Sequence, residues 1–100
     1  MNKYRTHNCN QLRSEDAGSK VSLAGWINRK RDHGNVLFVD LRDHYGVTQC
    51  VIEKTNTKLI NLVDSLRVES VIKIDGNVVE REPDTINKSL NTGTIEIAVD

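Results

Sequence analysis

Apolar and polar residues alternate most regularly between positions 36 and 42, near the middle of the chain. Leu37, Val39 and Leu41 share one parity, whereas Phe38, Asp40 and Arg42 share the other. Because successive side chains of a strand point to opposite faces, one face of this segment is aliphatic and the other is mostly polar. The pattern predicts a half-buried strand whose outer face carries the only phenylalanine of the chain.

Two short polar segments bound this strand, DHGN at residues 32–35 and DHYG at residues 43–46. Glycine and asparagine tolerate the positive φ angles of tight turns, and aspartate hydrogen-bonds nearby backbone groups. Residues 25–52 are therefore predicted to form three strands joined by two hairpin turns. Gly25, inside the first of these strands, indicates a bulge or a sharp bend.

After the third strand, the spacing of apolar residues changes from a period of two to that of a helix. Asn56 or Thr57 can cap this helix, whose apolar face would consist of Leu59, Leu62, Val63 and Leu66. We expect the helix to cover an open end of the sheet. Two more strands are predicted at residues 71–80 and 95–99, separated by a loop at 82–93 that contains the only proline.

Three meandering strands, one helix and two further strands are the element order of an OB-fold. The sequence therefore predicts an all-β domain with one helix, a five-stranded Greek-key barrel whose helix lies between strands three and four, over residues 19–100. Residues 1–18 are expected to form an N-terminal extension in which Cys9 and Leu12 anchor one short helical turn. OB-folds bind ligands on strands two and three and on the loops that join strands 1–2 and 4–5.

The outer face of the second strand places Phe38 one strand away from Arg29, Lys30 and Arg31. An aromatic ring beside cations is typical of a surface that stacks an unpaired base and holds its phosphates. Two alternatives stay open: Phe38 packs against a neighbouring domain, and the cations are only a solvated strand face. Trp26 is assigned to the core, because buried indoles are usual in small β domains.

The facing of Gln49 is not decided by the pattern. Alternation places it with Val47 and Val51, and hydrophobicity alone would turn that side inward. If Gln49 instead faces a ligand, the core must be filled by the residues of the other parity, Thr48, Cys50 and Ile52. Both parities remain open at this point.

Fourteen basic and fourteen acidic residues cancel, which argues against a general coater of DNA but allows selective binding by a local cationic cluster. Cys9 and Cys50 form no CxxC pair, so two buried thiols are expected and no metal site. No apolar run reaches the length of a membrane span and no signal peptide is apparent, so we expect a cytoplasmic protein without a membrane partner. No nucleophile–base constellation stands out, and no catalytic residue is assigned.

Three segments carry a more specific signal: YRTHNCNQLR at residues 4–13, GWINRKRDHGNVLFVDLRDHYGVTQ at 25–49 and NKSLNTGTIEI at 87–97. In this order and spacing they closely resemble the N-terminal anticodon-binding domain of bacterial aspartyl-tRNA synthetases. The resemblance covers nearly the whole chain. Related lysyl and asparaginyl enzymes share the fold and parts of the second-strand pattern.

The resemblance implies a fragment of a larger homodimeric class II enzyme that attaches aspartate to tRNA(Asp). ATP and magnesium would act in a catalytic domain that follows this one, and no cofactor is implied for the fragment. By the same resemblance, Phe38 would stack on an anticodon base and Gln49 would hydrogen-bond the central uridine. Arg29 and Arg31 would hold the anticodon backbone and bases, and Arg81 would contact the wobble purine.

The resemblance also bears on tRNA choice. Enzymes of this family that are strict for tRNA(Asp) typically carry Leu at the position of His33 and often Lys at the position of Asp84. Both positions differ here, which implies a non-discriminating enzyme that also charges tRNA(Asn). Two other function classes stay open beside the anticodon module: a free-standing single-strand nucleic-acid binder and an OB domain that serves only as a protein interface.

Overall fold

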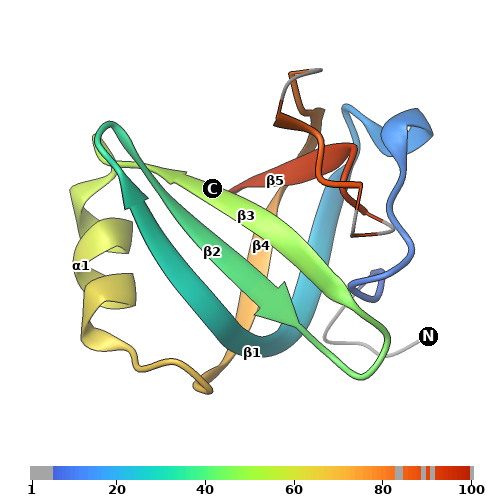
Figure 1. Ribbon diagram of the computed structural model, residues 1–100. Coiled ribbons are helices and arrows are strands. Elements are labelled where there is room, and N and C mark those ends of the chain that lie inside the picture. The colour runs from blue at the N-terminus through green and yellow to red at the C-terminus, as the bar shows by residue number, and fades with distance from the viewer. Residues whose placement is uncertain (1–5, 83–84, 89, 91, 100) are drawn as a thin grey trace.

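The computed structural model describes residues 6–82, 85–88, 90 and 92–99, with the side chain of His33 left out. Its elements follow the predicted order (Figure 1). They are the short 3-10 turn η1 (Ser14–Asp16), β1 (Lys20–His33), β2 (Val36–Arg42), β3 (Val47–Glu53), α1 (Thr57–Ser65), β4 (Val71–Glu80) and β5 (Ile95–Val99). The five strands form a closed barrel in the order β1-β2-β3-β5-β4, which confirms the predicted OB-fold.

The long first strand closes the barrel because it pairs with two neighbours. Its N-terminal half runs antiparallel to β4 and its C-terminal half runs antiparallel to β2, with Trp26 as the residue shared by both ladders. Gly25 lies at this bend, where a Cβ atom would stand 2.2 Å from the carbonyl oxygen of Arg42. The predicted bend is thus a close approach of two backbones that only glycine allows.

The turn between β1 and β2 has only two residues, Gly34 and Asn35, and Gly34 adopts a positive φ of 71°. The turn between β2 and β3 is organised by Asp43, whose Oδ1 accepts hydrogen bonds from the backbone N–H groups of Tyr45 at 2.8 Å and Gly46 at 3.1 Å. Both hairpins predicted from the sequence are therefore present, and their lengths set the register of the three strands.

The register of β2 against β3 decides which residues of β3 enter the core. Leu41 lies opposite Thr48, and Val39 lies opposite Cys50, so the aliphatic parity of β2 continues into these residues. Thr48 and Cys50 are fully buried, and the Thr48 hydroxyl donates a hydrogen bond to the carbonyl oxygen of Cys9 at 2.9 Å. Gln49 consequently points to the outer face of the barrel, which resolves the parity that alternation had left open.

The N-terminal segment is attached to the barrel by Cys9 and Leu12, both completely buried. The second carboxylate oxygen of Asp43 accepts from the Cys9 backbone N–H at 2.9 Å. Cys9 and Cys50 are buried thiols, as expected. The predicted helical turn is found at η1, which begins two residues after Leu12 and does not include Cys9 or Leu12.

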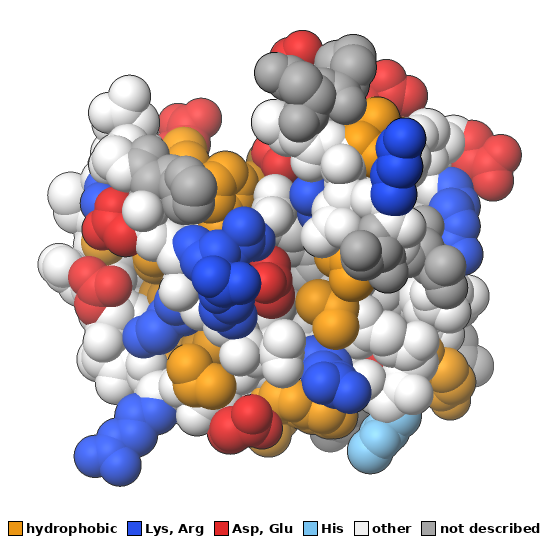
Figure 2. Space-filling model, in the orientation of Figure 1, with side chains coloured by type: hydrophobic (Ala, Val, Ile, Leu, Met, Phe, Trp, Pro, Cys, Tyr) orange, Lys and Arg blue, Asp and Glu red, His pale blue; other side chains and the backbone are white. Residues whose placement is uncertain are grey.

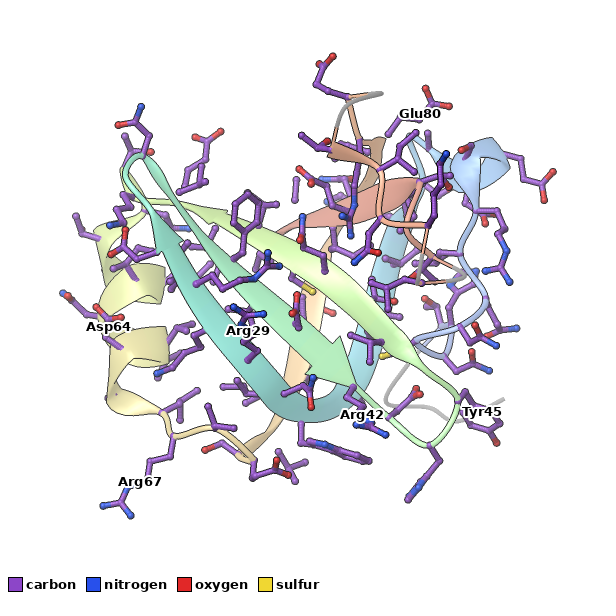
Figure 3. The ribbon with its side chains drawn as sticks, viewed as in Figure 1. Arg29, Arg42, Tyr45, Asp64, Arg67 and Glu80 are labelled. Atoms are coloured by element: carbon purple, nitrogen blue, oxygen red, sulfur yellow. The ribbon has the colours of Figure 1, made fainter. Side chains whose placement is uncertain are left out.

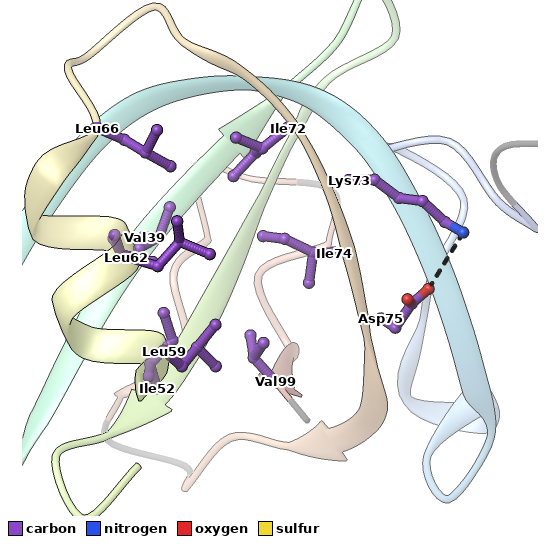
Figure 4. A pocket seen from close by; sticks show the side chains of 11 residues that line it. Val39, Ile52, Leu59, Leu62, Leu66, Ile72, Lys73, Ile74, Asp75 and Val99 are labelled. Atoms are coloured by element: carbon purple, nitrogen blue, oxygen red, sulfur yellow. Dashed lines mark ion pairs between the residues drawn. The ribbon is translucent and has the colours of Figure 1, made fainter. Parts of the chain in front are cut away.

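The helix α1 covers one end of the barrel. Asn56 is its N-cap, and its Oδ1 accepts from the Leu59 N–H at 3.3 Å. Lys30 of β1 holds the other end, since its Nζ donates to the carbonyl oxygens of Leu66 at 2.6 Å and Val63 at 3.3 Å. The cover is incomplete: Val63 is buried, but Leu62 stays 57% exposed beside an apolar hollow of about 400 Å³ between α1 and the strands (Figure 4).

Among the described helices, none has the length and apolar composition needed to cross a membrane.

Candidate nucleic-acid interface

The outer faces of β1, β2 and β3 form one continuous surface with three successive rows of side chains. The rows follow from the strand register: Arg31, Phe38 and Val51; Arg29, Asp40 and Gln49; Trp26, Arg42 and Val47. Lys and Arg side chains gather over these strands in the space-filling view (Figure 2). Arg29 and Arg42 project from this surface in the stick view (Figure 3).

Phe38 and Arg31 form the first row and contact each other. The guanidinium carbon of Arg31 lies 5.3 Å from the centroid of the Phe38 ring, within the range of a cation–π interaction. The ring is half-buried. A planar group that reached this row would therefore meet both an aromatic ring and a guanidinium plane, the two surfaces on which bases stack.

Gln49 sits in the second row and is held on both sides. Its Oε1 accepts from Arg31 Nη2 at 2.6 Å, and its Nε2 donates to Glu96 Oε1 at 3.0 Å. Arg31 Nη2 also donates to Asp40 Oδ1 at 2.9 Å, which extends the network across three strands. These neighbours leave Gln49 only 6% exposed although it faces outward. One N–H and one acceptor position of the amide remain available, because the network uses one of each.

Asp40 and Glu96 are members of this network that the sequence analysis did not single out. Glu96 reaches Gln49 because β5 runs parallel to β3, with Ala98 opposite Val51. Alternation in the last strand gave Glu96 the outward parity, but nothing in the sequence located that strand beside β3. Asp40 shares the parity of Phe38, so its outward position was visible, but its pairing with Arg31 was not.

Arg81 lies just beyond the end of β4, at the start of the loop toward β5. Its Nε donates to the Ile95 carbonyl oxygen at 2.9 Å and its Nη1 to that of Thr85 at 3.2 Å. Burial lowers the pKa of the Arg81 guanidinium, an effect that the nearby Glu96 carboxylate opposes. The charge of Glu96 thus connects Arg81 with the network around Gln49.

Two donors at this surface lack acceptors. Arg31 Nε and Arg81 Nη2 are buried and have no hydrogen-bond partner among the described residues. A buried N–H group without an acceptor destabilises the fold by about 1–3 kcal/mol, so such groups are rare and call for an explanation. Both belong to arginines that the sequence analysis selected.

Only some of the predicted site residues lie close together in the structure. Arg31 contacts both Phe38 and Gln49 in one network, whereas Arg81 bonds backbone carbonyls of residues 85 and 95. Arg29 lies in the row of Gln49, exposed and without an ion pair in the described part of the chain. His33 ends β1 beside the two-residue turn, but its side chain lies outside the described atoms, and Asp84 lies outside the described residues.

Within the described ranges, no group of three His, Cys, Asp or Glu side chains is placed to hold a metal ion. The surface offers cations, an aromatic ring and a side-chain amide. These groups bind and discriminate planar, anionic ligands.

Comparison with known proteins gives a consistent result. Residues 21–100 match the family described as an OB-fold nucleic acid binding domain. The chain is 57% identical over 99 residues to an aspartate–tRNA(Asp/Asn) ligase of Pelagibacter ubique, covering 99% of this chain and 16% of that protein. It is also 57% identical over 97 residues to the ligase of the same name from Rickettsia canadensis, covering 97% of this chain and 16% of that protein. The chain therefore spans only about a sixth of the curated relatives it matches.

Solved structures agree on the fold. Asparaginyl-tRNA synthetase from Pyrococcus horikoshii superposes with a TM-score of 0.77 at 26% identity, covering 93% of this chain and 20% of that one. An OBody bound to hen egg-white lysozyme superposes with a TM-score of 0.82 at 25% identity, covering 99% of this chain and 91% of that one.

Proposed function

This chain belongs to the family of OB-fold nucleic acid binding domains, and we propose that it is the anticodon-binding module of an aspartate–tRNA ligase. The observation that carries the proposal is the arrangement of Phe38, the Arg31 guanidinium and the Gln49 amide on one outer strand face, with the exposed Arg29 in the neighbouring row. An aromatic ring and a guanidinium plane stack bases, an amide hydrogen-bonds base edges, and an exposed arginine binds phosphate. The relatives named aspartate–tRNA(Asp/Asn) ligase support the choice of tRNA as the ligand.

Each residue then has a physical role in anticodon binding. Phe38 stacks on an anticodon base, and the amide of Gln49 hydrogen-bonds the edge of the central uridine with its remaining donor and acceptor. Arg29 and Arg31 hold the backbone and bases, and Arg81 contacts the wobble purine from the start of the last loop. Because Arg31 fixes the amide oxygen of Gln49, the orientation of the amide is set before the ligand arrives.

The proposal is tested by titrating the chain with an anticodon stem-loop of sequence GUC, a second stem-loop with central C, and a scrambled loop. The parent chain should prefer GUC. Gln49→Ala should lose roughly thirtyfold in affinity for central U, the effect of two neutral hydrogen bonds of about 1 kcal/mol each, and much less for central C. Equal losses for both loops contradict the role of Gln49.

The same titration separates the two alternatives. Equal affinity for the GUC and scrambled loops would identify a single-strand binder without sequence preference. Absence of binding to any loop would favour a protein interface, a use of this fold that the lysozyme-bound OBody illustrates.

The proposal extends to the longer protein. Attachment of aspartate to tRNA with ATP and magnesium would take place in a domain outside this chain, in a homodimeric enzyme, as expected from the resemblance, and we expect that enzyme in the cytoplasm. Residues 1–18 would be an N-terminal extension and residues 19–100 the OB domain. The burial of Cys9 and Leu12 supports an extension that is packed onto the barrel.

We further propose that the full-length enzyme charges both tRNA(Asp) and tRNA(Asn), whose anticodons differ only at the third base. His33 is the last residue of β1, next to the β1–β2 turn. An imidazole can donate or accept a hydrogen bond, so it can pair with either C or U at the third anticodon position, whereas a leucine side chain can hydrogen-bond neither base. Asp84 stands where strict enzymes of this family often carry Lys, so the sequence between β4 and β5 lacks that positive charge. Relatives named for both tRNAs support this.

Charging both tRNAs with the full-length protein tests this proposal. The parent enzyme should aspartylate both, and His33→Leu should favour tRNA(Asp) by about 1 kcal/mol, roughly fivefold. A parent enzyme that fails to charge tRNA(Asn) refutes the proposal without affecting the anticodon-binding role.

A further inference from the structure

A second aromatic feature lies on the same outer surface, at the bend of β1. Trp26 was predicted to lie in the core, and this prediction is wrong: Trp26 is half-buried and absent from the core cluster. The reason is the parity of β1, because Leu23 and Ile27 point inward and Trp26 has the opposite parity. Trp26 lies opposite Arg42 on β2 and Val71 on β4.

Trp26 lines a hollow of about 360 Å³ together with His44 and Tyr45 of the β2–β3 turn. The rings of Trp26 and His44 meet edge to face, with centroids 5.5 Å apart and planes at 69°. Val71, 81% exposed, forms an apolar rim. The volume is near the lower end of the range for small-ligand sites, about 300–1,000 Å³, and suits a single nucleobase.

A cation lies next to the hollow, although not in its lining: Arg42 is opposite Trp26 on the neighbouring strand. Arg42 is exposed, and no hydrogen bond or ion pair engages its guanidinium within the described ranges. The indole N–H of Trp26 likewise has no acceptor in the described part of the chain. The nearby carboxylate of Asp43 is directed to backbone N–H groups of Cys9, Tyr45 and Gly46, at 2.9, 2.8 and 3.1 Å.

The hollow adjoins the third row of this surface through Trp26. Phe38 and Arg42 have the same parity on β2 and are four residues apart, which at about 3.3 Å per residue is about 13 Å. In a stacked strand with about 3.4 Å per nucleotide, this distance corresponds to at most about four nucleotides. A nucleotide at Trp26 would therefore be a different one from the base on Phe38, but would belong to the same loop or to the stem end beside it.

We propose that this hollow binds one additional nucleotide of the same RNA, with the base against Trp26 and the phosphate on Arg42. The inference rests on the proposed anticodon-binding function. It gives the surface two aromatic–arginine pairs, Phe38 with Arg31 and Trp26 with Arg42. The second pair would fix where the RNA backbone enters the anticodon surface.

Trp26 is the only tryptophan of the chain, so its fluorescence reports the contact directly. Saturation with the GUC stem-loop should quench Trp26 emission. In a second series, each nucleotide that flanks the anticodon is made abasic in turn, and binding is measured by the anisotropy of the labelled RNA. One of these stem-loops should still bind but should no longer quench Trp26 emission. Unchanged emission at saturation overturns the inference and points to a protein as the occupant of the hollow.

Variants provide the second measurement. Trp26→Leu should weaken binding about tenfold, the scale of one stacked base. In this variant, the abasic substitution that abolishes quenching in the parent chain should cause no further loss of affinity. Arg42→Gln should lower affinity and flatten its salt dependence. Arg67→Gln should do neither, because this arginine is also exposed but lies just after α1, at the lower left of Figure 3. Arg42→Gln keeps the test valid if Trp26→Leu folds poorly.

The outcomes also distinguish the inference from the function on which it rests. Loss of binding in Phe38→Ala with parent-like binding in both Trp26→Leu and Arg42→Gln refutes the second site alone. Failure of the parent chain to prefer the GUC stem-loop over the scrambled loop refutes the anticodon-binding function as well.

Discussion

Arg31 is the residue through which the candidate site is coupled to the stability of the fold. Its Nη2 donates to Asp40 Oδ1 at 2.9 Å and to Gln49 Oε1 at 2.6 Å. The side chains of Arg31 and Asp40 are 28% and 16% exposed, so neither partner regains full hydration when the other is removed. Arg31→Met keeps the aliphatic stem but removes both hydrogen bonds.

The expected magnitude follows from these contacts. Hydrogen bonds to charged groups contribute about 1.5–3 kcal/mol each, partial exposure of Arg31 reduces that value, and the substitution also removes the buried, unpartnered Nε–H group, which offsets about 1–3 kcal/mol of the loss. We therefore expect Arg31→Met and Gln49→Ala each to lower the free energy of unfolding by about 1–2 kcal/mol. In the double variant the Arg31–Gln49 bond is lost only once, so the total should fall short of the sum by about 1–1.5 kcal/mol.

Urea denaturation of the parent, both single variants and the double variant measures this coupling. Arg29→Met is the matched control, because Arg29 lies one row away on the same strand, is exposed and has no ion pair in the described part of the chain. It should change stability by no more than about 0.5 kcal/mol. Additivity of the two site substitutions within about 0.5 kcal/mol refutes the claim that Arg31 holds the Gln49 amide.

Three other predictions follow from single residues. Phe38→Ala should lower affinity for the GUC stem-loop about tenfold in a folded chain, through loss of base stacking, and an unchanged affinity would leave Phe38 as a packing residue. Lys30→Met should lower the free energy of unfolding by about 1 kcal/mol in urea titrations, because Lys30 Nζ bonds the carbonyl oxygens at the end of α1; parent-like stability would contradict this. Burial raises the pKa of the Cys50 thiol well above 9.0, so stability should fall as the pH rises through the unfolded-state pKa, where only the unfolded thiol ionises. Cys50→Ala should show a shallower fall over the same pH range, and identical pH profiles would refute this effect.

The outward position of Gln49 could have been predicted from the sequence. Alternation within β3 gave two equivalent parities, because each side contains at least two apolar residues. The parity of β2 was unambiguous, however, and the four-residue turn places Arg42 opposite Val47. With that register, Leu41 faces Thr48 and Gln49 must point outward. The information was present in the turn length, and combining it with the second strand would have answered the question.

Other features depend on contacts between distant parts of the chain. Glu96 reaches Gln49 only because β5 inserts parallel to β3, and an alternating five-residue strand does not encode which neighbour it takes. Trp26 was misassigned for a different reason. Its hydrophobicity suggested burial, but Val21, Leu23 and Ile27 share the inward parity of β1 and Trp26 has the other parity. For this residue the alternation along the strand was a better guide to burial than hydrophobicity alone.

The distribution of charge reconciles a neutral chain with a nucleic-acid surface. The carboxylates nearest to the site are already engaged: Asp40 holds Arg31, Glu96 holds Gln49, and Asp43 binds backbone N–H groups. Arg29 and Arg42 are left exposed at the edges of the same surface. Acidic residues therefore fix the groups that would read bases, and exposed arginines remain to meet phosphates. Such a surface has few cations to attract nucleic acid in general, and most of its binding energy would have to come from the correct bases.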